Sequence, residues 1–115
     1  QHNRDIRLNY YGGIFMLKKD LIELCLLHLL DVEDLYGYEI LHRIHKSFPD
    51  TQESAIYALL RGLCKDGCTK QYEGKVSEGP TRKYYHITEA GQSKRKKLLN
   101  EWRRLRDTLI VLGIE

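Results

Sequence analysis

The segment DTQESAIYALLRGLCKDG, which runs from Asp50 to Gly67, decides the fold that we predict. Its large apolar residues recur at helical spacing and predict one buried helix face: Ile56, Leu59, Leu60 and Leu63. The opposite face carries small, aromatic and cationic residues: Ser54, Tyr57, Ala58, Arg61 and Lys65. We therefore expect an amphipathic helix whose exposed face is free to contact another molecule.

Residues near both ends of this segment predict where the helix begins and ends. Asp50 or Thr51 is the expected N-cap, and Glu53 stands three residues after Asp50 in a capping-box arrangement. Gly67 is the expected left-handed C-cap, because glycine adopts a positive φ without steric cost. The helix is thus expected to stop near Lys65.

Two further helices are predicted before this one. Leu17 to Leu30 is apolar at most positions and needs cover on most sides, which hints at a partner subunit in so short a chain. After a loop from Asp31 to Leu35, a second helix runs from Tyr36 to Ser47, and Pro49 ends it. The short turn between the second and third helices describes a helix-turn-helix.

The pattern changes to β-type after Gly67. Strands are predicted from Thr69 to Val76 and from Arg82 to Ile87, and Thr88 is the expected N-cap of a long last helix. Apolar residues of this helix alternate four- and three-residue steps, as in a coiled-coil seam: Leu98, Trp102, Leu105, Leu109 and Leu112. The seam needs another helix, and we expect the apolar first helix to cover it, from the same subunit or from its mate.

Together these elements predict an α+β fold that is mostly α. It is a winged helix-turn-helix with a two-stranded β wing and a long C-terminal dimerisation helix. Residues 1–15 are interpreted as an N-terminal arm or an expression remnant, residues 16–87 as the DNA-binding winged helix-turn-helix domain, and residues 88–115 as the dimerisation helix.

Four segments resemble the PadR family of bacterial transcriptional regulators. They are LYGYEI (35–40), SAIYALL (54–60), LCKDG (63–67) and GPTRKYYHITEAG (79–91). Their order and spacing cover about Leu17 to Leu112, and the short last helix is similar to the compact branch of the family. The resemblance implies a homodimer that represses nearby genes from a palindromic operator and is often released by a small molecule. Cys68, Thr69 and Ala58 depart from the residues usual in the family.

The third helix and the hairpin carry the residues expected to contact double-stranded DNA: Gln52, Ser54, Ala55, Tyr57, Arg61, Lys75, Arg82 and Lys83. Ser54 and Ala55 are small enough to admit the helix N-terminus into the major groove, and Gln52 offers an amide to a base. Tyr57 would reach a phosphate, and Arg61 would reach a phosphate or a guanine. The wing cations would contact the neighbouring DNA backbone or the minor groove. The alternatives are a packing role for Tyr57 and solvated surface charges for the cations.

The first and last helices carry the residues expected at the dimer interface: Leu21, Leu24, Leu98, Trp102, Leu105 and Leu109. The resemblance implies an aromatic residue at the place of Trp102 that borders a cavity at the dimer centre, where flat aromatic ligands stack. Trp102 and Arg106 are therefore candidate ligand-binding residues for a small aromatic effector, anionic or neutral because of the nearby arginines. The alternative is that Trp102 only fills the dimer seam.

Composition and motifs argue against other classes of protein. The net charge is only +3, so DNA binding must come from the local placement of Lys and Arg. We expect a cytoplasmic protein without a membrane partner, because the chain has neither an apolar run of ~20 residues nor the zones of a signal peptide. The histidines are scattered and no glycine-rich phosphate loop occurs, so neither enzymatic activity nor a cofactor is expected.

Two charged or reactive groups of residues invite other interpretations. The basic run from Ser93 to Lys97 is more typical of a solvated helix face than of a DNA contact. Cys64 and Cys68 lie four residues apart, but two thiols do not complete a zinc site, so we expect no metal. Packing as small hydrophobic residues is favoured for both, with a thiol redox switch as the alternative.

The main competing function is a protein-protein interaction module on the same scaffold, without sequence-specific DNA binding. The cationic wing, together with Tyr57 and Arg61, favours DNA. A steep salt dependence of binding would distinguish the two functions.

Overall fold

The computed structural model describes residues 16–75 and 79–115. In chain order, its elements are α2 (Lys18–Val32), β1 (Leu35–Tyr36), α3 (Gly37–Ser47), α4 (Glu53–Lys65), β2 (Thr69–Lys75), β3 (Thr81–Ile87) and α5 (Glu89–Val111). The predicted fold class is confirmed: four helices accompany a small antiparallel sheet whose hairpin forms a wing. The predicted arm at residues 1–15 and the turn residues 76–78 lie outside the described residues.

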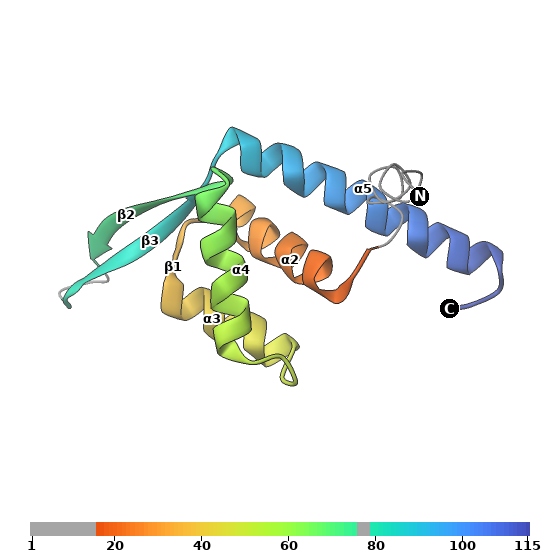
Figure 1. The fold of residues 1–115 in the computed structure, drawn as a ribbon, viewed down its shortest axis with the longest axis horizontal. Helices are drawn as coiled ribbons and strands as arrows, with labels where there is room; N and C mark the ends of the chain where they lie inside the picture. Colours follow the sequence, from red (N-terminus) through yellow and green to blue (C-terminus); the bar gives the residue numbers. More distant parts are fainter. Residues whose placement is uncertain (1–15, 76–78) are drawn as a thin grey trace, which may run out of the picture.

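Helix α2 lies at the centre of the molecule. This central position explains why the helix is apolar on most sides. Helix α5 runs along one side of α2, and α3 and α4 lie on the other side (Figure 1). The core joins α2 to all three of these helices and to the sheet: Ile22, Leu26, Leu27, Leu30, Leu35, Ile40, Ile44, Ile56, Leu60, Leu63, Tyr85, Ile87 and Leu98. The described residues of one subunit therefore supply much of the cover that α2 requires.

The N-terminus of α4 differs from the prediction. Its N-cap is Gln52, without a hydrogen bond from the cap side chain, so the predicted capping box between Asp50 and Glu53 is wrong. The Asp50 carboxylate instead lies 3.3 Å from Nζ of Lys18, at the first turn of α2. The hydrogen bond from Lys18 lowers the pKa of Asp50. Asp50 thus contacts a residue far away in the sequence instead of capping α4.

The C-terminus of α4 is as predicted: the helix stops at Lys65, and Gly67 follows as the left-handed residue. This residue has a φ of +82°, in the left-handed region that glycine adopts at low cost. Its N–H donates to the carbonyl of Cys64 at 3.0 Å, and the N–H of Cys68 donates to the carbonyl of Leu63 at 2.8 Å. These two bonds form a Schellman motif that turns the chain from the helix into the wing.

The sheet has one strand more than predicted. Its order is β1-β3-β2, and both pairings are antiparallel. The additional strand β1 pairs Leu35 with Tyr85 and Tyr36 with Tyr84. Two residues are too few to produce a detectable alternation, so this segment was expected to be the end of a loop and the start of a helix. The strand joins the helix-turn-helix to the wing.

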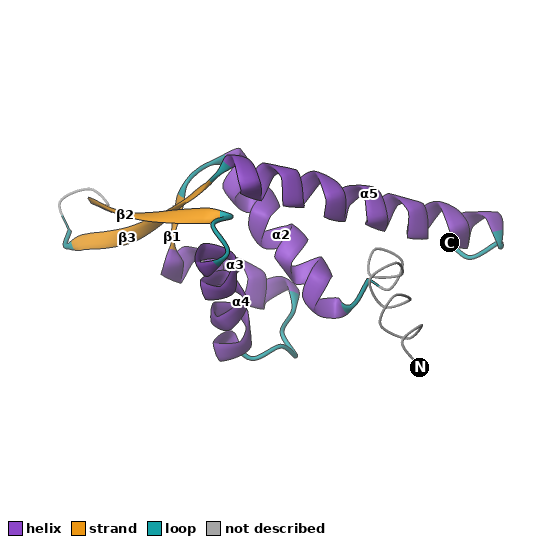
Figure 2. Cartoon of the chain, turned by 45° about the horizontal axis from the view of Figure 1, so that its top comes forward, coloured by secondary structure: helices purple, strands orange, loops and turns teal. Residues whose placement is uncertain are grey.

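Thr88 connects the wing to α5 and is the N-cap that the sequence predicts. Its hydroxyl accepts a hydrogen bond from the N–H of Gly91 at 3.1 Å and donates to the carbonyl of Gly67 at 2.6 Å. Its own N–H donates to the carbonyl of Cys68 at 3.0 Å. The start of α5 is therefore held against the end of α4, and α5 then extends well past the rest of the described chain (Figures 1 and 2).

Candidate nucleic-acid interface

Helix α4 presents small and polar side chains to solvent, because its apolar residues Ile56, Leu60 and Leu63 are buried. The exposed residues at its N-cap and along this face include five that were predicted to contact DNA: Gln52, Ser54, Ala55, Tyr57 and Arg61. The exposed side of the first turn carries only Glu53, Ser54 and Ala55, without a large apolar or aromatic side chain, so another molecule can approach the backbone there. A helix with such a face fits the major groove of DNA.

Tyr57 lies where α4 meets the sheet, and 41% of its surface is exposed. The guanidinium carbon of Arg61 lies 5.8 Å from the centre of its ring. Beneath it, Tyr85 is buried and accepts a hydrogen bond of 2.6 Å from Nε2 of Gln71. Burial raises the pKa of Tyr85, and the neighbouring Tyr57 hydroxyl adds to the effect. Tyr57 therefore packs with one side and exposes the other.

The wing carries three exposed cations: Lys75, Arg82 and Lys83. Arg82 is partly fixed, because its guanidinium carbon lies 5.5 Å from the centre of the Tyr36 ring. Within residues 16–75 and 79–115, neither Arg61 nor any of these wing cations takes part in an ion pair. Cations without an acidic partner remain available to neutralise phosphates.

A groove of about 370 Å³ runs between the start of α3, the exposed face of α4 and the wing. Its lining includes aromatic and cationic side chains from all three elements: Tyr36, Tyr38, Tyr57, Arg82 and Lys83. The structure therefore brings Tyr57 together with two of the three predicted wing cations. The predicted base-reading residues at the start of α4 and Lys75 do not line this groove.

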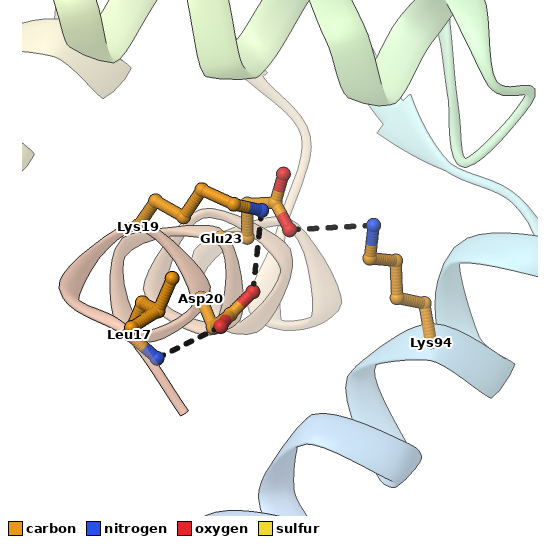
Figure 3. Close-up of polar contacts among 5 residues, drawn as sticks. All are labelled: Leu17, Lys19, Asp20, Glu23 and Lys94. Atoms are coloured by element: carbon orange, nitrogen blue, oxygen red, sulfur yellow. Dashed lines mark hydrogen bonds and ion pairs between the residues drawn. The ribbon is translucent and has the colours of Figure 1, made fainter. Parts of the chain in front are cut away.

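Two of the four cations in the basic run at the start of α5 pair with carboxylates of α2. Nζ of Lys94 lies 3.3 Å from the carboxylate of Glu23, as Figure 3 shows, and Arg95 lies 3.7 Å from the carboxylate of Asp31. Asp20, in the same view, accepts a hydrogen bond from the N–H of Leu17 at 2.8 Å and so holds the start of α2. Two cations of the run thus hold the helix pair together.

The predicted dimer and ligand residues line two apolar cavities on α2 and α5. Leu21, Leu24 and Trp102 border a cavity of about 610 Å³ between α2, α3 and α5. A second cavity, of about 650 Å³, lies along the later part of α5 and is lined by Leu21, Trp102, Leu105, Arg106 and Leu109 among others. The guanidinium carbon of Arg106 lies 5.1 Å from the centre of the Trp102 ring. Leu98, in contrast, belongs to the core of the subunit.

The cysteines pack as small hydrophobic residues. Cys68 is buried, and Cys25 and Cys64 are half-buried. Burial raises the pKa of the Cys25 and Cys68 thiols, which keeps both in the less reactive protonated form. In the described part of the chain, no three His, Cys, Asp or Glu side chains gather where they could hold a metal ion. None of the helices described is long and apolar enough to cross a membrane.

A cluster around Asp34 was not predicted. The Tyr72 hydroxyl donates to Oδ2 of Asp34 at 2.6 Å, and Nδ1 of His86 lies 2.9 Å from Oδ1 of the same carboxylate. The three residues come from the loop after α2 and from both strands of the wing. The only signal in the sequence was the tyrosine-rich, alternating pattern of the strands, which does not reveal a partner 38 residues away.

Comparison with known proteins gives a consistent result. Residues 26–97 match the sequence model of the Transcriptional regulator PadR-like family. An uncharacterized protein from Lysinibacillus sphaericus is 34% identical over 110 residues, which cover 87% of this chain and all of that protein.

Solved structures share the fold. The crystal structure of a PadR-like transcriptional regulator from Bacillus cereus superposes with a TM-score of 0.73 at 32% identity, over 80% of this chain and 90% of the other. A PadR family transcription regulator from Clostridium difficile gives a TM-score of 0.69 at 26% identity, over 79% of this chain and 96% of the other.

Proposed function

This chain belongs to the PadR-like family of transcriptional regulators, and we propose that it is a ligand-responsive repressor that binds a palindromic operator as a homodimer. In this proposal residues 16–87 bind DNA and residues 88–115 form the dimerisation helix. The N-terminal half of α4 enters the major groove, with Gln52, Ser54 and Ala55 closest to the base edges.

One observation carries the DNA-binding part of the proposal. Tyr57 on α4 and the cations Arg82 and Lys83 on the wing line a single groove. A phosphate strand that follows the edge of the major groove would meet the Tyr57 hydroxyl and the wing cations in succession. Affinity would come largely from these phosphate contacts, and specificity from the side chains at the start of α4.

The first prediction concerns the double variant Tyr57→Ala, Arg82→Ala. We expect its affinity for duplex DNA from its own promoter region to fall at least about tenfold, because each subunit loses two phosphate contacts. The logarithm of the affinity should also depend less steeply on the logarithm of the salt concentration. Fluorescence anisotropy with labelled DNA, repeated at several salt concentrations, measures both quantities.

A matched control is Lys97→Ala, which removes an exposed cation from α5 and should leave affinity nearly unchanged. Weak binding by the unmodified protein, indifferent to DNA sequence and to the double substitution, would contradict the proposal. That outcome would favour a protein-interaction module instead.

The homodimer is supported by apolar surface that the described residues of one subunit leave uncovered. The last turn of α5 and its C-cap expose large aliphatic side chains: Leu109, Ile110, Val111 and Leu112. These residues continue the helix beyond the part that packs on α2 (Figure 1). A second copy of the chain would bury them, and would also set the distance between two recognition helices.

An effector site at Trp102 is proposed from the pairing of this ring with Arg106 beside an apolar cavity. Such a site suits a flat aromatic anion, which would stack on the indole and compete for the guanidinium with the Asp107 carboxylate, which lies 3.0 Å from Arg106. Because Trp102 is the only tryptophan in the chain, its fluorescence reports on binding there.

The second prediction uses anilinonaphthalene sulfonate, a flat aromatic anion, as the probe. We expect it to quench Trp102 fluorescence and to weaken operator binding over the same concentration range. Arg106→Ala should weaken binding of the probe several-fold, while Arg103→Ala, an exposed neighbour without a stacking contact, should not. Operator affinity that stays constant while Trp102 is quenched would overturn the effector proposal alone.

A further inference from the structure

Three tyrosines form a row across the outer face of the sheet. Tyr84 on β3 pairs in register with Tyr36 on β1 and with Tyr72 on β2, so the three side chains share one face. Their ring centres are 5.8 Å apart for Tyr36 and Tyr84, and 5.6 Å apart for Tyr84 and Tyr72. Tyr85, the next residue, points to the buried face. The row therefore connects all three strands outside the core.

One end of this row is anchored by a carboxylate. Asp34 accepts the Tyr72 hydroxyl at 2.6 Å and contacts Nδ1 of His86 at 2.9 Å. An ionised carboxylate only accepts hydrogen bonds, so His86 must donate through Nδ1–H. Burial raises the pKa of Asp34, but the bonds from Tyr72 and His86 outweigh it and leave that pKa below its usual range. The bond to Asp34 raises the pKa of Tyr72, which keeps its hydroxyl a donor.

The other end of the row supports a cation of the candidate DNA interface. The guanidinium carbon of Arg82 lies 5.5 Å from the centre of the Tyr36 ring. The middle ring occupies space that a side chain at position 74 would fill, because a Cβ on Gly74 would lie 2.9 Å from Cδ1 of Tyr84. Gly74 thus leaves room for Tyr84 to lie between its two neighbours.

We propose that Asp34 is a positioning residue for operator binding, which acts through the tyrosine row to fix the orientation of Arg82 on the wing. This inference rests on the proposed function, because Arg82 must contact DNA for its orientation to matter. A free arginine side chain loses much rotational freedom when it binds a phosphate, and a chain already held on Tyr36 loses less. Asp34 holds the far end of the tyrosine row that supports Arg82, although Asp34 lies in the loop after α2 rather than on the wing.

Whether Asp34→Ala weakens or strengthens DNA binding distinguishes a positioning role of Asp34 from a purely electrostatic effect of its charge. Removal of a negative charge near DNA should by itself strengthen binding. We expect Asp34→Ala to weaken it instead, by about two- to fivefold, the fold-change equivalent to an exposed cation–π contact. Tyr72→Phe, which keeps the ring and removes only the hydroxyl, should have a similar or smaller effect. Glu33→Ala removes a neighbouring, more exposed carboxylate and should strengthen binding slightly or leave it unchanged.

The experiment is a double-mutant cycle read by anisotropy with labelled operator DNA. Asp34→Ala is compared with the unmodified protein, and the comparison is repeated in the Arg82→Ala background. We expect the loss from Asp34→Ala to disappear when Arg82 is absent. A loss of equal size in both backgrounds, or an effect no different from that of Glu33→Ala, would overturn the inference.

The cycle also separates this inference from the proposed function. Failure of the unmodified protein to bind the operator, or binding that ignores Arg82→Ala, would remove the premise that the wing contacts DNA. Operator binding that depends on Arg82 but not on Asp34 would remove only the positioning role. Thermal unfolding of each variant establishes that the proteins compared are folded.

Discussion

Gly91→Ala is expected to destabilise the protein by about 3 kcal/mol, at the upper end of what overpacking costs. A Cβ at this position would overlap the backbone carbonyl oxygen of Cys68 and would lie 2.7 Å from Cγ1 of Ile87. The carbonyl cannot move away easily, because it accepts the hydrogen bond from the N–H of Thr88 that holds the start of α5. Either the start of α5 or the turn at Cys68 between α4 and β2 must shift.

Urea unfolding at a fixed protein concentration measures this effect, since the stability of an oligomer depends on concentration. The matched control is Gly62→Ala, in the middle of α4, where a Cβ would meet no atom within 4 Å. That substitution should leave the free energy of unfolding unchanged or raise it by up to about 1 kcal/mol, because alanine favours helix. An unfolding midpoint for Gly91→Ala equal to that of the unmodified protein would refute the close approach of α5 to Cys68.

The parts of the fold that follow from local chemistry were predictable from the sequence. The apolar spacing of α4 placed Ile56, Leu60 and Leu63 in the core. Gly67 was identified as a C-cap because glycine adopts a positive φ at low cost, and Thr88 as an N-cap because its hydroxyl accepts a hydrogen bond from a backbone N–H of the first turn. In each case the signal and the structure lie within a few residues of each other.

Features set by long-range contacts were not predictable. Asp50 looked like a capping residue, but its carboxylate pairs with Lys18 on another helix. Strand β1 is too short to show an alternation of apolar and polar residues. It is defined by its pairing with β3, in which Tyr36 lies opposite Tyr84. The contact between Asp34 and Tyr72 spans 38 residues and leaves no periodic trace.

The candidate site shows the same division. The outward position of Tyr57 and Arg61 followed from the helical repeat of α4. The support of Arg82 by Tyr36 and the closeness of Tyr57 to the wing required the three-dimensional arrangement. Within the basic run of α5, only the structure separates Lys94, which pairs with Glu23, from the exposed Lys97.

Leu109→Glu is expected to convert the proposed homodimer into a folded monomer. Leu109 is 45% exposed, so the substitution removes little from the core of the subunit, but it would place a charge in the apolar surface assigned to the partner. Sedimentation velocity measures the change in mass, and circular dichroism checks that the helices remain. Asn100→Glu, at an exposed position of α5 outside both cavities, adds the same charge and should stay dimeric.

The affinity of the same variant for an operator with two half-sites should fall about 10²-fold or more, because two linked DNA-binding domains bind far more tightly than one. Its affinity for a single half-site should match that of the unmodified protein, since α4 and the wing are untouched. The half-site measurement is the decisive one: equal binding there, with loss only on the full operator, follows from a broken dimer and not from a damaged interface. A variant that remains dimeric, or that binds the full operator as well as the unmodified protein does, would mean that α5 does not join the two subunits through Leu109.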